Sequence, residues 1–348
     1  MSLRLPLEDI RVVEFEGIGP GPLAGRMLLG MGASVTLIAR PTAGAVATKL
    51  GADAGEMERG KQRVVLDLKS EAGRAEAMDL IASADVLIEG LRPGVMERLS
   101  LGPADCARRN PRLVYGRMTG WGQSGPLAQA AGHDLNYVAL SGLLSLSAYR
   151  GERPIVPPTV VGDAAGALGL AFGIACAVVD ARATGQGRVV DAAIVDIAAM
   201  LGSIAHVVRA AGQLDTAAPS PFHDSPFYDV FECADSRFIT LGALEPQFYA
   251  LLLDKLGITD LEPREQYDVR QWPTVKARIQ AIVKSRTRDE WAALLEGSDV
   301  CFAPVLSVQE AAQHPHNLAR GNFLPAEDGA VHGGVAPTFT PLNPVEPS

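Results

Sequence analysis

Residues 10–39 read IRVVEFEGIGPGPLAGRMLLGMGASVTLIA, and this stretch decides the fold class. It begins and ends with runs of aliphatic and β-branched residues, Ile10–Phe15 and Ser34–Ala39, which are typical of strands buried on both faces. Between them a glycine-rich turn leads into a stretch of helical spacing, Pro22–Met31, and proline suits the first helical position because it has no N–H to leave unpaired. Strand, helix and strand in this order predict a parallel βαβ unit.

The same alternation continues through the first 120 residues. We expect a further helix at 71–83 and further strands at 63–68, 85–89 and 113–116. The first part of the chain is therefore predicted to be an α/β domain, with helices packed around a Rossmann-like, mostly parallel sheet.

The second half has a different composition. Residues 162–212 are rich in Ala and Gly and read as long helices interrupted by a short strand at 188–191. Beyond a stretch rich in Pro and Ser at 217–226, a strand pair at 227–231 and 238–241 is followed by helices at 247–256, 272–285 and 288–295. We expect a large α/β domain at 1–190 and 325–348, a helical linker at 191–226 and a small α+β domain at 227–324, with an irregular tail from Leu324 onward.

The composition excludes several classes of protein. With 47% hydrophobic and 20% charged residues, the chain is expected to be globular, and its 348 residues suggest about two domains. Lys and Arg number 31 against 40 Asp and Glu, so the net charge of −9 repels polyanions and argues against nucleic acid as a partner.

Compartment and membrane signals point to the cytoplasm. The four cysteines lie far apart without a CxxC pair, which argues against a disulfide framework or a zinc site. The longest apolar run, Ala164–Val179, is shorter than the ~20 residues of a membrane span, so we read it as a buried helix. The first residues do not resemble a signal peptide and the last are no peroxisomal address, and we expect a cytoplasmic protein.

The glycine-rich turn at 17–25 has two interpretations. It fits a loose dinucleotide fingerprint, but its two prolines remove N–H donors that would face a pyrophosphate. Arg40 also stands where an acidic ribose partner is expected at the end of the second strand. We therefore favour a tight strand-to-helix turn that needs glycine over an NAD(P) site.

Four cations fall in connections next to predicted strands: Arg40, Arg59, Lys61 and Arg92. A parallel sheet could gather them along one edge, where arginine offers a planar fork to phosphate oxygens and lysine a point charge. The alternative is that they are scattered surface charges.

Ionisable groups stand at three predicted helix starts: His133 with Asp134, then Asp163, then Glu245. Each has a structural alternative, because Asp163 could cap its helix, Glu245 could favour the helix dipole and His133 could be a satisfied polar residue. Taken together they suggest chemistry, since helix amino termini offer N–H groups to an oxyanion and neighbouring groups can move protons.

Two further motifs are set aside. Ser124 lies between glycines, but its spacing fails the nucleophile-elbow pattern. His314 and His316 could suggest a metal, but a third ligand is not obvious.

At these residues the chain resembles the α-methylacyl-CoA racemases, a branch of the CoA-transferase family III fold. The resemblance extends nearly from end to end. The stretches that carry it are RVVEFEGIGPGP (11–22), MGASVTLIARP (31–41), DVLIEGLRPGV (85–95), RMTGWGQ (117–123), GHDLNY (132–137), VGD (161–163), VVDAA (189–193) and GALEPQFY (242–249). One departure is His223-Asp224 before the Pro-Phe-Tyr-Asp stretch, where the racemases have a glycine pair.

The resemblance implies roles for particular residues. His133, with Glu245 as its partner, and Asp163 would be catalytic, and in the wider transferase fold the residue matching Asp163 is a nucleophile. Arg40 would lie against the adenine of CoA and Arg92 would meet its phosphates. The remaining substrate- or CoA-binding candidates are Arg59, Lys61, Gly132, Asp134, Tyr137 and Tyr228.

The resemblance also implies an interlocked homodimer whose site lies between the large domain of one chain and the small domain of the other. We expect a racemase that interconverts 2-methylacyl-CoA epimers through an enolate, with two bases and without a metal or organic cofactor, CoA being part of the substrate. The alternatives are a CoA-transferase that uses Asp163 as nucleophile through an acyl-enzyme anhydride, and a non-catalytic protein that binds CoA esters.

Overall fold

A computed structural model describes residues 4–42, 55–149, 151–325 and 331–342. The chain divides into two compact units. The first unit comprises residues 1–145, 155–201 and 321–348, and the second comprises 146–154 and 202–320. The division differs from the expected one, because the predicted linker is shared, with 191–201 in the first unit and 202–226 in the second. The segment 146–154 belongs to the second unit and 321–324 to the first.

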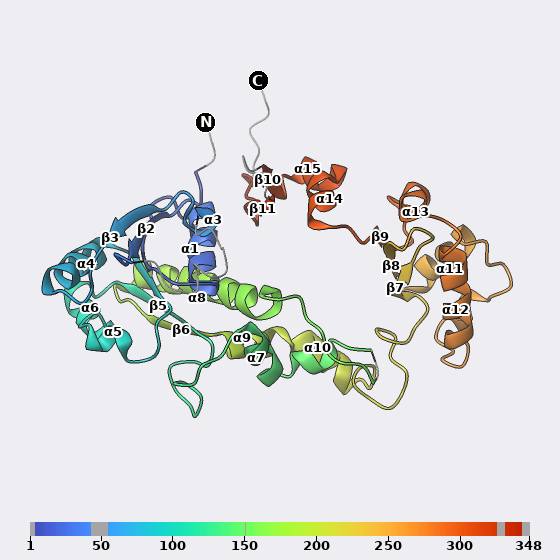
Figure 1. Cartoon of the computed structure of the whole chain (residues 1–348), viewed down its shortest axis with the longest axis horizontal. Coiled ribbons are helices and arrows are strands. Elements are labelled where there is room, and N and C mark those ends of the chain that lie inside the picture. Colours follow the sequence, from blue (N-terminus) through green and yellow to red (C-terminus); the bar gives the residue numbers. More distant parts are fainter. Residues whose placement is uncertain (1–3, 43–54, 150, 326–330, 343–348) are drawn as a thin grey trace, which may run out of the picture. The chain divides into compact units, whose positions relative to one another are not determined.

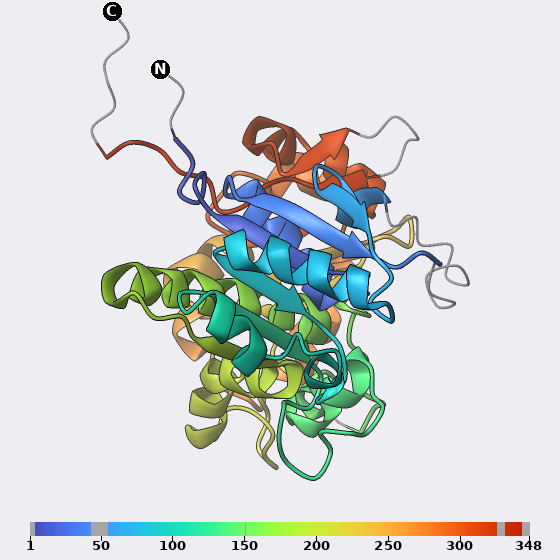
Figure 2. The same cartoon turned by 90° about the vertical axis from the view of Figure 1, so that its left-hand side faces the viewer.

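The first unit is built on a six-stranded sheet in the order β3-β2-β1-β4-β5-β6 (Figures 1 and 2). Every neighbouring pair in it is parallel. The α/β class predicted from the sequence is therefore confirmed, and the strand order is that of doubly wound dinucleotide-binding folds. The strands are β1 (Arg11–Phe15), β2 (Ser34–Ala39), β3 (Gln62–Val65), β4 (Val86–Glu89), β5 (Val114–Thr119) and β6 (Val189–Ala193).

Alternate strand residues face different helical layers, because successive side chains of a strand point to opposite faces. Val12 belongs to a core that includes residues of α1 (Pro20–Gly30) and α8 (Ala165–Thr184). Its neighbour Val13 belongs to another core, shared with α4 (Glu71–Ser83) and α6 (Pro103–Arg109). Burial on both faces explains why the inner strands β1, β2, β4 and β5 read as continuous aliphatic runs.

Shorter elements complete the first unit. Its other helices are α3 (Gly55–Glu58), α5 (Val95–Arg98), α7 (Asp134–Leu140) and α9 (Ile194–Leu201), with a π-helical turn at Val160–Ala164 and a 3₁₀ turn at Leu143–Leu146 on the boundary between the units. The expectation of an irregular tail was wrong in part, because β10 (Phe323–Pro325) pairs with β11 (Val331–Gly333) in an antiparallel ribbon.

Glycines in helix α8 allow side chains of β6 and α9 to pack closely against its backbone. A Cβ added at Gly166 would lie 2.8 Å from Ile194 Cγ1, one at Gly169 2.6 Å from Ile197 Cδ1, and one at Gly173 2.7 Å from Val190 Cγ1. Together with the turn before it, the helix is long and apolar enough to cross a membrane by length and composition, which is weak evidence because core helices pass the same test. It packs on β5, β6 and α1 as a layer of the first unit.

The second unit contains a three-stranded antiparallel sheet in the order β7-β8-β9. Its core gathers the aromatic side chains of Phe227, Phe231, Trp272 and Trp291 with aliphatic residues of the surrounding helices. The strands are β7 (Tyr228–Glu232), β8 (Phe238–Gly242) and β9 (Phe302–Pro304), and the helices are α10 (Ser203–Ala210), α11 (Pro246–Lys255), α12 (Trp272–Val283), α13 (Arg288–Leu295), α14 (Val308–Gln313) and α15 (Pro315–Arg320).

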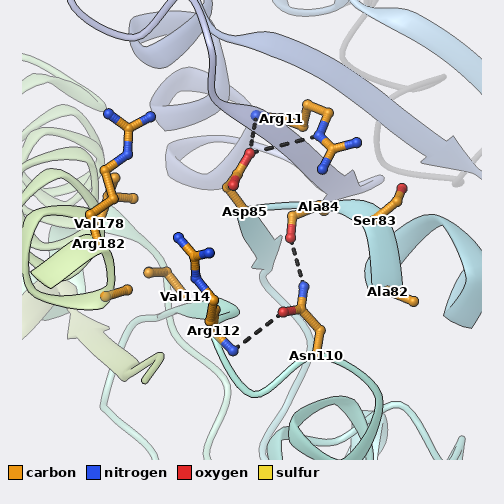
Figure 3. A pocket seen from close by; sticks show the side chains of 11 residues that line it. Arg11, Ala82, Ser83, Ala84, Asp85, Asn110, Arg112, Val114, Val178 and Arg182 are labelled. Carbon is orange, nitrogen blue, oxygen red and sulfur yellow. Dashed lines mark hydrogen bonds and ion pairs between the residues drawn. The ribbon is translucent and has the colours of Figure 1, made fainter. Parts of the chain in front are cut away.

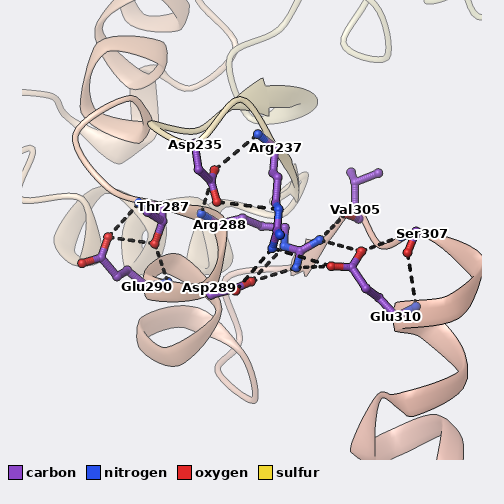
Figure 4. Close-up of polar contacts among 9 residues, drawn as sticks. All are labelled: Asp235, Arg237, Thr287, Arg288, Asp289, Glu290, Val305, Ser307 and Glu310. Carbon is purple, nitrogen blue, oxygen red and sulfur yellow. Dashed lines mark hydrogen bonds and ion pairs between the residues drawn. The ribbon is translucent and has the colours of Figure 1, made fainter.

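An arginine network joins the starts of two of these helices (Figure 4). The buried Arg288 donates to Glu310 at 2.8 and 3.0 Å and to the carbonyl of Val305 at 3.1 Å. Hydrogen bonds from Arg288, and then those at Ser307, lower the pKa of Glu310 to about 2. Glu310 therefore remains a carboxylate, and α14 is fixed to the start of α13.

Candidate active site

The connections that follow β1 and β4 lie at the carboxyl ends of the strands, where we expect the ligand to bind. These neighbouring strands are the point at which the strand order reverses, with β2 and β3 on one side and β5 and β6 on the other. In open parallel sheets, ligands bind outside the carboxyl ends of the strands at such a switch point. The segments there are Glu16–Gly19 after β1 and Gly90–Pro93 after β4.

Asp163 lies at this switch point. A Cβ added at Gly19 would come within 3.1 Å of Asp163 Oδ2, so the carboxylate lies against the residue that opens α1. Gly19 has φ +71°, a conformation that costs other residues free energy. Asp163 belongs to the π-helical turn before α8 and does not cap that helix, so the capping alternative is not realised.

Asp134 fixes the backbone around Asp163. Its buried Oδ1 accepts the N–H of Gly162 at 2.8 Å and that of Asp163 at 2.7 Å. His133 precedes it as the N-cap of α7, where its extended backbone N–H donates to Asn136 Oδ1 at 3.0 Å. The sequence-predicted pair of His133 and Asp134 is therefore brought to the same place as Asp163.

This arrangement makes Asp163 a weaker acid. Burial raises its pKa, the charge of Asp134 raises it further, and the charge of His133 opposes both. A carboxyl group with a raised pKa next to an imidazole is suited to proton transfer, because both its protonated and ionised forms are accessible nearer neutral pH.

Tyr137 and Gly132 form a wall beside these groups. The buried Tyr137 hydroxyl donates to the carbonyl of Gly132, and its ring meets that of Trp121 edge to face at 4.7 Å. Neither Gly132 nor Gly120 has room for a Cβ beside the tyrosine ring. Burial, and then the charge of Asp163, raise the pKa of Tyr137, so the phenol remains protonated.

The four predicted phosphate-binding cations do not share one edge of the sheet. Arg40 follows β2, and Arg92 follows β4, so both lie toward the carboxyl ends of the strands. Arg59 and Lys61 instead precede β3, at the opposite end of a parallel strand. The expectation that the four cations lie together was wrong, because a residue before a strand lies at the amino ends of a parallel sheet and a residue after a strand lies at the carboxyl ends.

Lys61 is engaged in a buried ion pair rather than presented to a ligand. Its Nζ contacts Glu14 Oε1 at 2.8 Å and Oε2 at 2.7 Å, and donates to the carbonyl of Pro22 at 2.9 Å. The side chains of Lys61 and Glu14 are 0% and 1% exposed. The pair therefore ties β1 to the first turn of α1, and nothing in the sequence pattern indicated it. Arg59 lies at the surface, 3.7 Å from Glu56.

Arg40 and Arg92 differ in their present partners. Arg40 donates its backbone N–H and its Nε to Glu16 Oε2 at 2.9 and 3.0 Å. Burial raises the pKa of Glu16, but these hydrogen bonds and the charge of Arg40 outweigh burial, and the pKa is lowered. Arg92 is exposed, and its guanidinium has no hydrogen-bond partner among the described residues.

A buried network supports the loop that carries Arg92. Glu89 accepts the N–H of Leu91 at 2.7 Å and the Nε of Arg117 at 2.9 Å. Arg117 also donates to Glu97 in α5 at 2.8 Å. These contacts fix the turn on both sides of Arg92, and no spacing or motif in the chain indicated them.

Glu245 and Tyr228 belong to the second unit. Glu245 is the N-cap of α11, followed by Pro246, and its side chain makes no capping hydrogen bond. The carbonyl before it, that of Leu244, accepts Gln266 Nε2 at 3.1 Å and the Tyr267 hydroxyl at 2.6 Å. Tyr228 is partly exposed and meets the Phe222 ring at 5.3 Å. Gln266 and Tyr267 therefore hold the backbone next to Glu245, and no sequence motif indicated them.

We expect Gly19→Ala to lower turnover more than it lowers stability. The substitution places a methyl group against Asp163 Oδ2 and adds the cost of a positive φ at a residue with a Cβ, about 1–3 kcal/mol. Gly142→Ala is the matched control, because Gly142 has φ +87° with no atom within 4 Å of an added Cβ. Steady-state rates and unfolding temperatures of both variants check this, and equal losses of rate would contradict it.

Comparisons with known proteins identify the family of the chain. The sequence model of the family described as CoA-transferase family III matches residues 7–346. The chain is 39% identical to human alpha-methylacyl-CoA racemase over 98% of its own length and 88% of that protein's. It is 30% identical to acetyl-CoA:oxalate CoA-transferase of Acetobacter aceti, over 98% and 89% of the two chains.

A solved structure supports the same assignment. The crystal structure of Rv3272 from M. tuberculosis has a TM-score of 0.80 and 27% identity, covering 97% of this chain and 93% of that one. With a family match over nearly the whole length and relatives above 30% identity, the chain belongs to CoA-transferase family III.

Proposed function

We propose that this protein interconverts the (R) and (S) forms of 2-methylacyl-CoA thioesters. The observation that carries the proposal is the Asp163 carboxyl group at the switch point, with its pKa raised by burial and by Asp134, in the field of His133. The similarity to human alpha-methylacyl-CoA racemase supports the same reaction.

The reaction requires a base on each face of the substrate. The hydrogen α to a thioester carbonyl is a weak acid, and it leaves only when the enolate oxygen is stabilised and a base is in contact. One group removes the proton, and the other, already protonated, returns one to the opposite face. We assign these roles to His133 and Asp163. The proposed step uses no metal or organic cofactor.

Solvent exchange tests this function directly. Purified protein is incubated with single epimers of several 2-methylacyl-CoA thioesters in deuterated buffer and followed by NMR. We expect deuterium to enter the α position while the other epimer accumulates. If neither exchange nor epimerisation occurs with any thioester that the protein binds, the racemase proposal is wrong and a binding protein remains.

A CoA-transferase is the second candidate. The carboxylate of Asp163 could instead attack the thioester carbonyl, displacing CoA thiolate and forming an acyl-enzyme anhydride. The similarity to acetyl-CoA:oxalate CoA-transferase favours testing it. Hydroxylamine would trap the anhydride as a hydroxamate on Asp163, whereas a racemase would give none.

For CoA binding we propose Arg92 and Arg40. Arg92→Ala is expected to raise KM about tenfold or more with a much smaller change in kcat, because phosphate contacts are equally present in ground and transition states. Arg108→Ala is the control, since Arg108 is an exposed arginine of the same unit paired with Asp105. A collapse of kcat at constant KM would rule out this role for Arg92.

We further propose a homodimer in which Glu245 of one chain orients His133 of the other. Co-refolding of inactive His133→Ala and inactive Glu245→Ala subunits is expected to restore part of the activity, because one of the two sites in a mixed dimer would carry both intact residues. Native mass spectrometry would verify that mixed dimers form. Mixed dimers without activity would place both residues in one chain.

A further inference from the structure

A pocket of about 150 Å³ lies at the amino ends of the strands of the same sheet and is partly open to solvent. Its walls come from the first residues of β1 and β5, from the end of α4 and the segments before β4 and β5, and from the last turns of α8 (Figure 3). These are the amino ends of parallel strands, whereas Asp163 stands beyond the carboxyl end of β1.

The length of helix α8 shows how far the pocket lies from Asp163. Asp163 stands just before its first residue and Arg182 in its last turn. A helix of 20 residues is about 30 Å long at 1.5 Å per residue. The pocket is therefore too far from Asp163 to be a part of the proposed active site.

Three arginines and one aspartate line this pocket: Arg11, Arg112, Arg182 and Asp85. Asp85 Oδ2 accepts the backbone N–H of Arg11 at 2.9 Å and lies 3.8 Å from its Nε. The guanidinium groups of Arg112 and Arg182 have no hydrogen-bond or ion-pair partner in the part of the chain that the structure describes. With one carboxylate against three guanidinium groups, the lining carries two uncompensated positive charges.

The walls between these arginines are already held in place. Asn110 Nδ2 donates to the carbonyls of Ala84 at 2.7 Å and Ile81 at 3.2 Å, and its Oδ1 accepts the N–H of Arg112 at 3.3 Å. Asn110 thus connects the segment before β4 to the segment before β5. An anion would enter a pocket whose backbone needs little further ordering, which favours binding.

We propose that this pocket binds a small polyanion, through the guanidinium groups of Arg112 and Arg182. Each planar guanidinium fork matches a phosphate or carboxylate group. A ligand with two or more anionic groups could place one group at each of these two guanidinium forks. The chemical class is therefore a compact diphosphate or polycarboxylate, and it is bound independently of the acyl-CoA reaction.

Calorimetric titration of the full-length protein tests this, with inorganic pyrophosphate in one arm and citrate in the other. Saturating CoA is present to occupy the substrate site, and the ionic strength is low because salt screens exposed charges. We expect saturable binding of at least one anion, and the arm that binds more tightly distinguishes phosphate from carboxylate ligands. Binding of neither anion would overturn the proposal.

Variants locate the binding. Arg112→Ala with Arg182→Ala should weaken binding at least tenfold, and Arg112→Lys with Arg182→Lys should weaken it less, because lysine keeps the charge but loses the fork. Arg108→Ala should leave it unchanged. Circular dichroism and unfolding temperature verify that each variant is folded. Equal affinities in wild type and in a folded double-alanine variant would show that the anion binds elsewhere and would overturn the proposal.

Discussion

Replacing Asp163 by asparagine is expected to lower the rate of racemisation about 10³-fold, within the range that general acid–base catalysis contributes. The amide has the size of the carboxyl group and can still accept a hydrogen bond, but it cannot take up or release the substrate proton. The rate is measured by the appearance of the opposite epimer. Asp180→Asn is the control, because it makes the same change near the far end of α8, where Asp180 pairs with Arg188.

The two bases predict opposite residual activities. Asp163→Asn should still exchange solvent deuterium into the epimer whose hydrogen faces His133, while His133→Ala should exchange only the other epimer. Reversible operation requires the two pKa values to approach each other, and burial of Asp163 moves its pKa in that direction. Loss of exchange for both epimers in both variants would contradict the two-base assignment.

The second large effect is on stability, and it concerns Lys61→Met. Removing the ammonium leaves the Glu14 carboxylate buried without its partner, which typically costs about 3–5 kcal/mol. Burial already raises the pKa of Glu14 to about 7 against the lowering effect of Lys61, so in the variant this pKa rises further. Chemical denaturation monitored by circular dichroism measures the loss.

The pH dependence of this loss has a definite sign. A carboxyl group whose folded-state pKa lies above its unfolded value of 4.5 favours the folded state at low pH, and this contribution is lost as pH rises toward and through the folded pKa. The Lys61→Met variant should therefore be closer to wild type at pH 5 than at pH 8. Adding Glu14→Gln removes the buried charge and should recover part of the stability at pH 8. An equal loss at both pH values would show that Glu14 is not the cause.

The parallel sheet could be predicted because each buried strand is an aliphatic run bounded by turn residues. The ends of elements were less predictable, because local hydrogen bonds decide them. The third strand was expected to reach Leu68 but ends at Val65, since Asp67 turns the chain by accepting the N–H of Ser70 before α4. The helix expected through Ala198 and Ile204 is two helices that meet at Gly202, and the three-residue strand β9 was missed.

The catalytic candidates were easier to predict than their supports. His133, Asp134 and Asp163 stand in short motifs at helix starts, and the structure brings them together. Lys61 was misjudged because sequence position does not tell whether a long side chain extends to solvent or across the sheet to Glu14. The support of Glu245 by Gln266 depends on residues more than 20 positions apart, for which a single sequence holds no pairing signal.

The glycine face of α8 limits how this enzyme could be made more heat-resistant. Exchanging helical glycines for alanine usually stabilises a protein by about 0.4–1 kcal/mol, because it restricts the unfolded chain. At Gly166, Gly169 and Gly173 the new methyl group would overlap side chains of β6 and α9, so the same exchange should cost stability. It would also push on the helix that begins beside Asp163. Substitutions meant to raise thermal stability should therefore spare the glycines of α8. They should instead use glycines at which an added Cβ would have no atom within 4 Å.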